Sequence, residues 1–138
     1  MDLNRFFHVL NDESLKNQME NDIENFKSSP YYKLGMFNKL ILNGLGFKRQ
    51  VVSFFEKSIP EVDKIELAGE FMIYNRAWFW ISQFNWDEEN WVEDLKKIED
   101  EYFLTSIKLS ISYFEENEDY EKCAFLKKIQ DFIEESLA

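Results

Sequence analysis

The sequence predicts an all-α chain that folds as a single-domain bundle of about six or seven helices. Apolar residues recur at helical spacing along nearly its whole length. Gly (4) and Pro (2) are scarce, so few of the tight turns that a β-sandwich or β-barrel requires can form. The 138 residues, of which 45% are hydrophobic, suffice for one buried core. We therefore expect one domain over 1–138, with short helices in 1–59 and long acidic helices in 60–138.

Two short helices are expected before Pro30. Asp2 caps the first, and either Asp12 or Ser14 caps the second, because these side chains accept hydrogen bonds from the free amides of a first turn. The second helix ends at Ser28-Ser29-Pro30, since the residue before a proline avoids the helical region. The residues expected to face inward are Leu3, Phe6, Phe7 and Leu10 in the first helix and Leu15, Met19, Ile23 and Phe26 in the second.

Two further helices are expected in the mildly basic segment 30–58. The third helix runs from about Tyr31 to Asn43-Gly44-Leu45-Gly46, where the glycines end it, as they do at many helix C-termini. A short fourth helix over 51–55 closes at Ser58-Ile59-Pro60. The residues expected to face inward are Leu34, Phe37, Leu40 and Ile41 in the third helix and Val51, Val52, Phe54 and Phe55 in the fourth.

Three long helices are expected in residues 60–138, packed antiparallel because only short turns join them. Pro60 suits a first helical turn, and Asp87 serves as the N-cap of the next helix. The expected bounds are about 60–84, 87–114 and 119–136, with a polar turn at 115–118. The residues of the last two helices that are expected to face inward are Trp91, Leu95, Ile98, Tyr102, Leu104, Ile107, Ile111, Phe114, Tyr120, Cys123, Leu126, Ile129 and Ile133.

Charge is distributed unevenly along the chain, whose net charge is −11. Residues 1–59 carry 8 basic and 7 acidic side chains, whereas residues 60–138 carry 8 basic and 20 acidic ones. An acidic segment of this strength repels nucleic-acid phosphate and attracts basic surfaces. The expected partner is therefore another protein with a basic surface, and direct binding of nucleic acid is not expected.

Aromatic residues are concentrated in the segment 71–91. At 100° per residue they cover most of the circumference of a helix, and such a helix is normally buried on all sides. This favours a central place in the bundle. The alternative is that one or more rings stay exposed and anchor a partner, because Trp, Tyr and Arg dominate interface hot spots. The candidate anchors are Arg76, Phe79, Trp80, Trp86 and Trp91.

Arg76 has a second interpretation, as a core arginine that pairs with Glu70 or with an acid of the sixth helix. The acidic residues beside the aromatic segment also have two interpretations. They form either a solvated helix face or an electrostatic docking surface that gives fast, salt-sensitive association. The candidate docking acids are Asp87, Glu88, Glu89, Glu93 and Asp94.

The chain offers few residues that could carry catalysis or bind a metal. A single cysteine, Cys123, excludes an internal disulfide and a multi-Cys zinc site. A single histidine, His8, argues against a His-based metal site or a Ser–His–Asp triad. No metal, cofactor or catalytic residue is expected. Cys123 is expected on the inner face of the last helix, where the nearby helix N-terminus would lower the pKa of its thiol.

The first residues lack the basic and apolar regions of a signal peptide. The most apolar stretch, 71–84, is too short to span a bilayer, so no membrane partner is expected. Because a lone unpaired cysteine is typical of reducing compartments, a cytoplasmic location is expected.

The last hairpin resembles the UVR motif, a helical hairpin of excision-repair nuclease subunits and of some Clp-protease regulators. Asp119-Tyr120-Glu121-Lys122 matches its start, Cys123-Ala124 stands where it has two alanines, and Leu126-Lys127 where it has Leu-Arg. Phe125 and Gln130 depart from the pattern. Residues 116–130 are also similar to the second half of a tetratricopeptide unit. Both resemblances imply a helical hairpin that makes protein–protein contacts, and neither implies a catalytic residue.

These observations predict a small, acidic, non-enzymatic protein that binds another protein and occludes or bridges it. Inhibitors, immunity proteins and adaptors of bacteria and phages share this profile. One alternative is an assembly subunit or homodimer that uses the aromatic segment 71–91. A second alternative is an enzyme with a carboxylate-based site, which requires a pocket where Glu70, Arg76 and a second carboxylate converge.

Overall fold

The computed structural model describes residues 3–5, 13–55 and 62–137. Residues 3–5 are helical. The helices that follow are α2 (Glu13–Ser28), α3 (Pro30–Phe55), α4 (Val62–Ile81), α5 (Glu89–Lys96), α6 (Tyr102–Glu116) and α7 (Tyr120–Leu137). No strand occurs in the described ranges, so the all-α prediction is confirmed.

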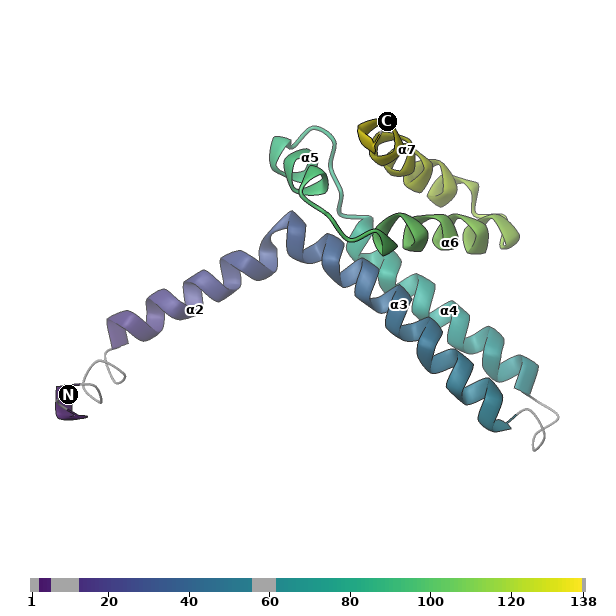
Figure 1. Cartoon of the computed structure of the whole chain (residues 1–138), viewed down its shortest axis with the longest axis horizontal. Coiled ribbons are helices and arrows are strands. Elements are labelled where there is room, and N and C mark those ends of the chain that lie inside the picture. Colours follow the sequence, from purple (N-terminus) through teal and green to yellow (C-terminus); the bar gives the residue numbers. More distant parts are fainter. Residues whose placement is uncertain (1–2, 6–12, 56–61, 138) are drawn as a thin grey trace.

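The core lies where the first half of α3 and the second half of α4 meet α5, α6 and α7 (Figure 1). α3 packs antiparallel against α4, and α6 packs against α7 as a second hairpin. Two parts extend away from this core in different directions: the α2 arm (13–28) and the hairpin arm (42–55 and 62–73). The buried apolar residues are Leu34, Phe37, Ile41, Tyr74, Ala77, Ile81, Phe84, Trp91, Leu95, Phe103, Ile107, Phe114, Leu126 and Ile129.

The expected helix end at 43–46 is wrong, because α3 continues without interruption and includes the expected short helix at 51–55. Gly44 faces α4, where a Cβ atom on it would stand 2.6 Å from Cγ1 of Ile73. A side chain at this position would collide with α4, so the glycine permits the close approach of two helices. The expected close of this region at Ser58-Ile59-Pro60 lies outside the described residues.

The expected sixth helix is two helices, α5 and α6, separated by residues 97–101. The carboxylate of Asp100 accounts for the start of α6. Its Oδ1 accepts a hydrogen bond from the backbone N–H of Tyr102 (2.9 Å), and its Oδ2 accepts one from Nδ2 of Asn38 on α3 (3.0 Å). Asn38 is buried and also accepts a hydrogen bond from the hydroxyl of Ser106 (2.6 Å). This network fixes the start of α6 against α3.

The segment between α4 and α5 also differs from expectation. α4 ends at Ile81 rather than Phe84, and Glu88, not Asp87, is the N-cap of α5. The backbone N–H of Asp87 instead donates to Oδ1 of Asn85 (3.0 Å), which forms a local Asx turn. Asp87, expected to be the N-cap, therefore lies in this turn, one residue before the N-cap.

The turn between α6 and α7 falls where the sequence predicts it. Glu118 has φ 60°, and the amides of Glu118 and Asp119 donate to the carbonyls of Glu115 (3.0 Å) and Phe114 (2.8 Å). This is the Schellman arrangement that ends many helices. The hairpin implied by the UVR-like residues is therefore present as α6 and α7, although Tyr120, expected to face inward, is exposed.

The α2 arm has the predicted C-terminal end but not the predicted environment. It begins at Glu13, so Ser14 lies inside it, and none of its residues is buried. The four apolar residues expected to face inward form a stripe, here called the α2 stripe, in which Leu15 is half-buried and the other three are exposed: Leu15, Met19, Ile23 and Phe26. The predictions for Asp2, for residues 6–10 including His8, for Asp12 and for Pro60 lie outside the described residues.

Candidate partner-binding surface

The first turn of α3 brings α5 and α4 together. Pro30 has no N–H to satisfy at the first helical position, and the N–H of Tyr32 donates to Oγ of Ser29 (3.2 Å). The N–H of Tyr31 donates to Oδ2 of Asp94 on α5 (3.1 Å). Asp94 therefore caps α3 across the fold, which is a structural role for one of the five predicted docking acids.

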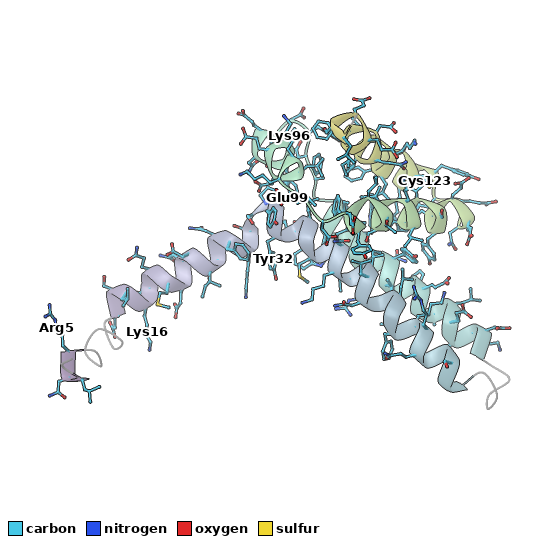
Figure 2. All side chains as sticks on the ribbon, viewed as in Figure 1. Arg5, Lys16, Tyr32, Lys96, Glu99 and Cys123 are labelled. Atoms are coloured by element: carbon cyan, nitrogen blue, oxygen red, sulfur yellow. The ribbon has the colours of Figure 1, made fainter. Side chains whose placement is uncertain are left out.

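Four rings lie edge to face in a row across the junction of α2, α3 and α4. Phe26 contacts Tyr32 (ring centroids 5.5 Å apart), Tyr32 contacts Trp80 (6.0 Å), and Trp80 contacts Phe79 (5.3 Å). We call this row the aromatic ladder. Figure 2 shows Tyr32 at the corner where α2 meets α3. The ladder ends at Phe79, whose side chain is 61% exposed, so one of the predicted anchors is available to a partner.

Two of the predicted anchors instead hold the core together. Trp91 is only 5% exposed, packs 5.4 Å from the ring of Phe84, and has the ammonium of Lys33 at 5.7 Å from its centroid. Trp86 is half-buried, 4.7 Å from the ring of Phe84 and 5.5 Å from that of Phe132 on α7. Trp91 is therefore not an exposed anchor, and Trp86 mainly joins the α4–α5 segment to α7.

The acids at the start of α5 remain exposed: Asp87, Glu88, Glu89 and Glu93. None of these four carboxylates lies within ion-pair distance of a basic side chain in the described part of the chain. Unpaired exposed charges of one sign raise the local potential and steer oppositely charged partners. Asp94 differs from them, since it lies 3.5 Å from the ammonium of Lys97 and is occupied by the cap on α3.

The hairpin arm contains a pocket of about 400 Å³ between α3 and α4. Its lining residues are Leu40, Asn43, Gly44, Phe47, Lys48, Ile65, Glu66, Gly69, Met72, Ile73 and Arg76. Arg76 is exposed and does not pair with Glu70, because Glu70 binds Lys48. Lys48 also lies 3.1 Å from Glu66. The enzyme alternative requires Glu70, Arg76 and a second carboxylate to converge in a pocket. The described residues that line this pocket do not show that arrangement.

Several ionisable groups hold their protons more tightly in the folded chain. Burial, followed by the nearby charge of Glu70, raises the pKa of Tyr74 and of Tyr113, whose rings stack 4.3 Å apart. Burial by itself lowers the pKa of Lys48, but its hydrogen bonds to Glu70 and Glu66 outweigh that effect and raise it. Burial, with the charges of Glu115 and Asp119, raises the pKa of Cys123. The expected lowering of this thiol's pKa by its helix N-terminus is therefore wrong.

These shifts predict a loss of stability in alkali. Each folded-state pKa lies above its ordinary value, which is 9.0 for Cys123 and 10.0 for the two tyrosines. Above those values the unfolded chain releases more protons than the folded chain, so the free energy of unfolding falls as pH rises. Urea unfolding should give a constant value from neutral pH up to about pH 8.5 and a declining one above it. The decline should be shallower in Tyr113→Phe, and a stability that holds or rises in alkali would contradict the assignment.

No helix in the described ranges is both long and apolar enough to cross a membrane. The same ranges contain no group of three or more His, Cys, Asp or Glu side chains placed to hold a metal ion. No protein-family model matches this chain, and no curated protein or solved structure is significantly similar to it.

Proposed function

We propose that this chain is a non-enzymatic protein-binding protein that occludes or bridges a partner with a basic surface. The binding surface consists of the exposed end of the aromatic ladder, Trp80 and Phe79, and the acidic start of α5. Both parts are held by the first turn of α3, the ladder through the ring of Tyr32 and α5 through the bond between Asp94 and Tyr31. The surface is therefore fixed in shape before a partner arrives.

The observation that carries this proposal is the exposure of Phe79, together with exposed acids at the start of α5 that have no ion-pair partner among the described residues. A ring already held by Trp80 loses little rotational freedom when a partner buries it, which is the property of interface hot spots. The exposed carboxylates add long-range attraction, which raises the association rate and makes it depend on salt. An inhibitor, an immunity protein or an adaptor would use such a surface.

The test starts from capture of a partner by the tagged chain from its native source, at ~50 and ~200 mM salt. The dissociation constant of the captured partner is then measured with two matched phenylalanine variants. Phe79→Ala should weaken binding by at least about 10-fold, whereas Phe71→Ala should not. Phe71 is on the same helix and is equally exposed, at 61%. Equal binding by the two variants would contradict the proposed surface.

A second pair of variants tests the electrostatic part. Glu89→Lys combined with Glu93→Lys should slow association and weaken its dependence on salt, because these charges steer the encounter. Glu121→Lys combined with Glu135→Lys, two exposed acids of α7, changes the net charge equally and should have the smaller effect. If both pairs act alike, the partner responds to net charge alone and α5 is not its docking site.

The alternative of a permanent assembly through the segment 71–91 is favoured by a different observation. Phe71 and Met72 are also exposed on α4, and together with Phe79 they make the uncovered side of that helix apolar. An interface of that kind should form in the purified chain and respond little to salt.

A further inference from the structure

The α2 stripe is an apolar helix face that is mostly open to solvent: Leu15 is half-buried, and Phe26 contacts the ring of Tyr32. Met19, Ile23 and Phe26 are 56%, 52% and 58% exposed. With Leu15 they fall within an arc of about 80° on the helix, as in a helix that packs against a partner. A helix of 16 residues is marginal in water without such packing. The stripe therefore indicates that the α2 arm is covered in the protein's working state.

The pocket of the hairpin arm is the matching concave surface. Its apolar wall, formed by Ile65, Met72 and Ile73 of α4 and by Leu40 and Phe47 of α3, surrounds about 400 Å³. Along α4 it runs from Ile65 to Arg76, about 16 Å of helix, which equals the length of the stripe from Leu15 to Phe26. In the hairpin arm, packing of α3 against α4 leaves the groove side of the apolar helix α4 open. A third helix placed in the groove would cover that side and complete a three-helix core.

The α2 arm cannot fill the pocket of its own chain. Only Ser29 separates α2 from α3, and an antiparallel pair of helices needs a loop of about two to five residues. The junction is also held by the hydroxyl of Ser29, which donates to the carbonyl of Phe26 and accepts from the N–H of Tyr32. Figure 1 accordingly shows α2 pointing away from the hairpin arm. The contact can form only between different molecules.

We propose that the pocket between α3 and α4 receives the α2 stripe of a second copy of this chain, in a two-fold dimer that exchanges its arms. This inference goes beyond the proposed function, because it concerns a different surface and needs no other protein. In such a dimer each copy contributes one arm and one groove, so that the same contact forms twice.

Charge supports a second copy as the occupant. The α2 arm contains four acidic and two basic residues, whereas the charged residues that line the pocket are Lys48, Glu66 and Arg76, of which Lys48 and Glu66 already pair with each other. Arg76 is exposed at the rim of the pocket, with no carboxylate of the described residues within ion-pair distance. An acidic arm thus meets the unpaired guanidinium of Arg76, and the attraction is present twice in the dimer.

The solvent-accessible area of the chain also supports a second copy as the occupant of the groove. The chain exposes 10174 Å², whereas a compact monomer of 16.7 kDa exposes about 7,600 Å². The surplus of about 2,500 Å² per chain is of the size that one partner contributes to a large obligate interface. The α2 arm contributes to this exposed area, because none of its residues is buried.

The test uses the purified full-length chain, whose mass in solution is measured by light scattering over a range of concentrations. The unmodified chain should be a dimer. Ile23→Asp should raise the dimer dissociation constant by at least about 100-fold, because it places a charge in an apolar contact. Asn21→Asp adds the same charge to the same helix on the side away from the stripe and should leave the dimer intact. Circular dichroism checks that both variants keep the helix content of the unmodified chain.

Mixing two variants distinguishes a dimer that exchanges its α2 arms from a dimer formed through another surface. Ile23→Asp damages the arm and leaves the groove, whereas Met72→Asp damages the groove and leaves the arm, so each alone should be monomeric. Mixed in equal amounts they should form a heterodimer, detectable by native mass spectrometry, because one arm still meets one intact groove. A monomeric unmodified chain, a dimer that tolerates Ile23→Asp, or a mixture that stays monomeric would each overturn the proposal. None of these results affects the test on Phe79, which depends on a different protein.

Discussion

Replacement of Phe37 with alanine is expected to lower the free energy of unfolding by about 3–5 kcal/mol. Phe37 is 1% exposed at the centre of the core, and its ring lies edge-on to that of Phe103, 5.9 Å away. The substitution removes the ring and leaves a cavity between α3 and α6 that neighbouring helices can close only in part. A loss of this size is a large fraction of the stability of most domains.

Urea unfolding followed by tryptophan fluorescence measures the change. Phe71→Ala is the matched control, because it removes the same ring from a position that is largely exposed. We expect it to change the free energy of unfolding by less than about 0.5 kcal/mol in the monomer. If the two variants lose similar stability, the core is not centred where α3 meets α6.

Replacement of Gly44 with valine is the second large effect, a loss of about 1–3 kcal/mol through overpacking. The Cβ atom would lie 2.6–2.9 Å from three side-chain carbons of Ile73. Rotation of Ile73 relieves only part of the overlap, so α3 and α4 must separate. A glycine inside a helix otherwise lowers helix stability, and any larger residue would be favoured there by propensity alone.

Gly46 supplies the control for that prediction. It lies in the same helix, and a Cβ atom on it would meet nothing within 4 Å. Gly46→Ala should therefore raise the free energy of unfolding by about 0.8–1 kcal/mol. In the Gly44→Val background, Ile73→Ala should recover part of the loss, since the two positions share one contact. Stabilisation by Gly44→Val itself would show that α3 and α4 are not in close contact there.

The features that were predicted from sequence are those that depend on neighbouring residues. Proline restricts the residue before it, so the end of α2 at Ser28 follows from Ser29-Pro30 alone. The polar turn before α7 is equally local. Apolar spacing likewise identified most of the apolar residues that are buried in α3 and α7, whereas in α6 Tyr102, expected to face inward, is exposed and Phe103 is buried.

The features that were missed depend on residues far away in the chain. A glycine can end a helix or admit a neighbouring one, and only Ile73, 29 positions later, decides between them for Gly44. Asp94 and Asp100 bond to residues 63 and 62 positions earlier, which a pattern of charges does not reveal. A helix that is apolar on all sides does not indicate which ring is exposed, so the exposed Phe79 and the buried Tyr74 of α4 could not be told apart. Periodicity in α2 indicated an apolar face but not which chain covers it.

Because only Ser29 joins α2 to α3, a small change of angle at this junction moves the far end of the α2 arm by a large distance. Its 16 residues extend about 24 Å from the junction, so a rotation of about 10° there displaces the far end by about 4 Å. The hydroxyl of Ser29 holds that angle, because it donates to the carbonyl of Phe26 on α2 (2.6 Å) and accepts from the N–H of Tyr32 on α3 (3.2 Å). The direction in which the arm reaches thus depends on a single serine hydroxyl between the two helices.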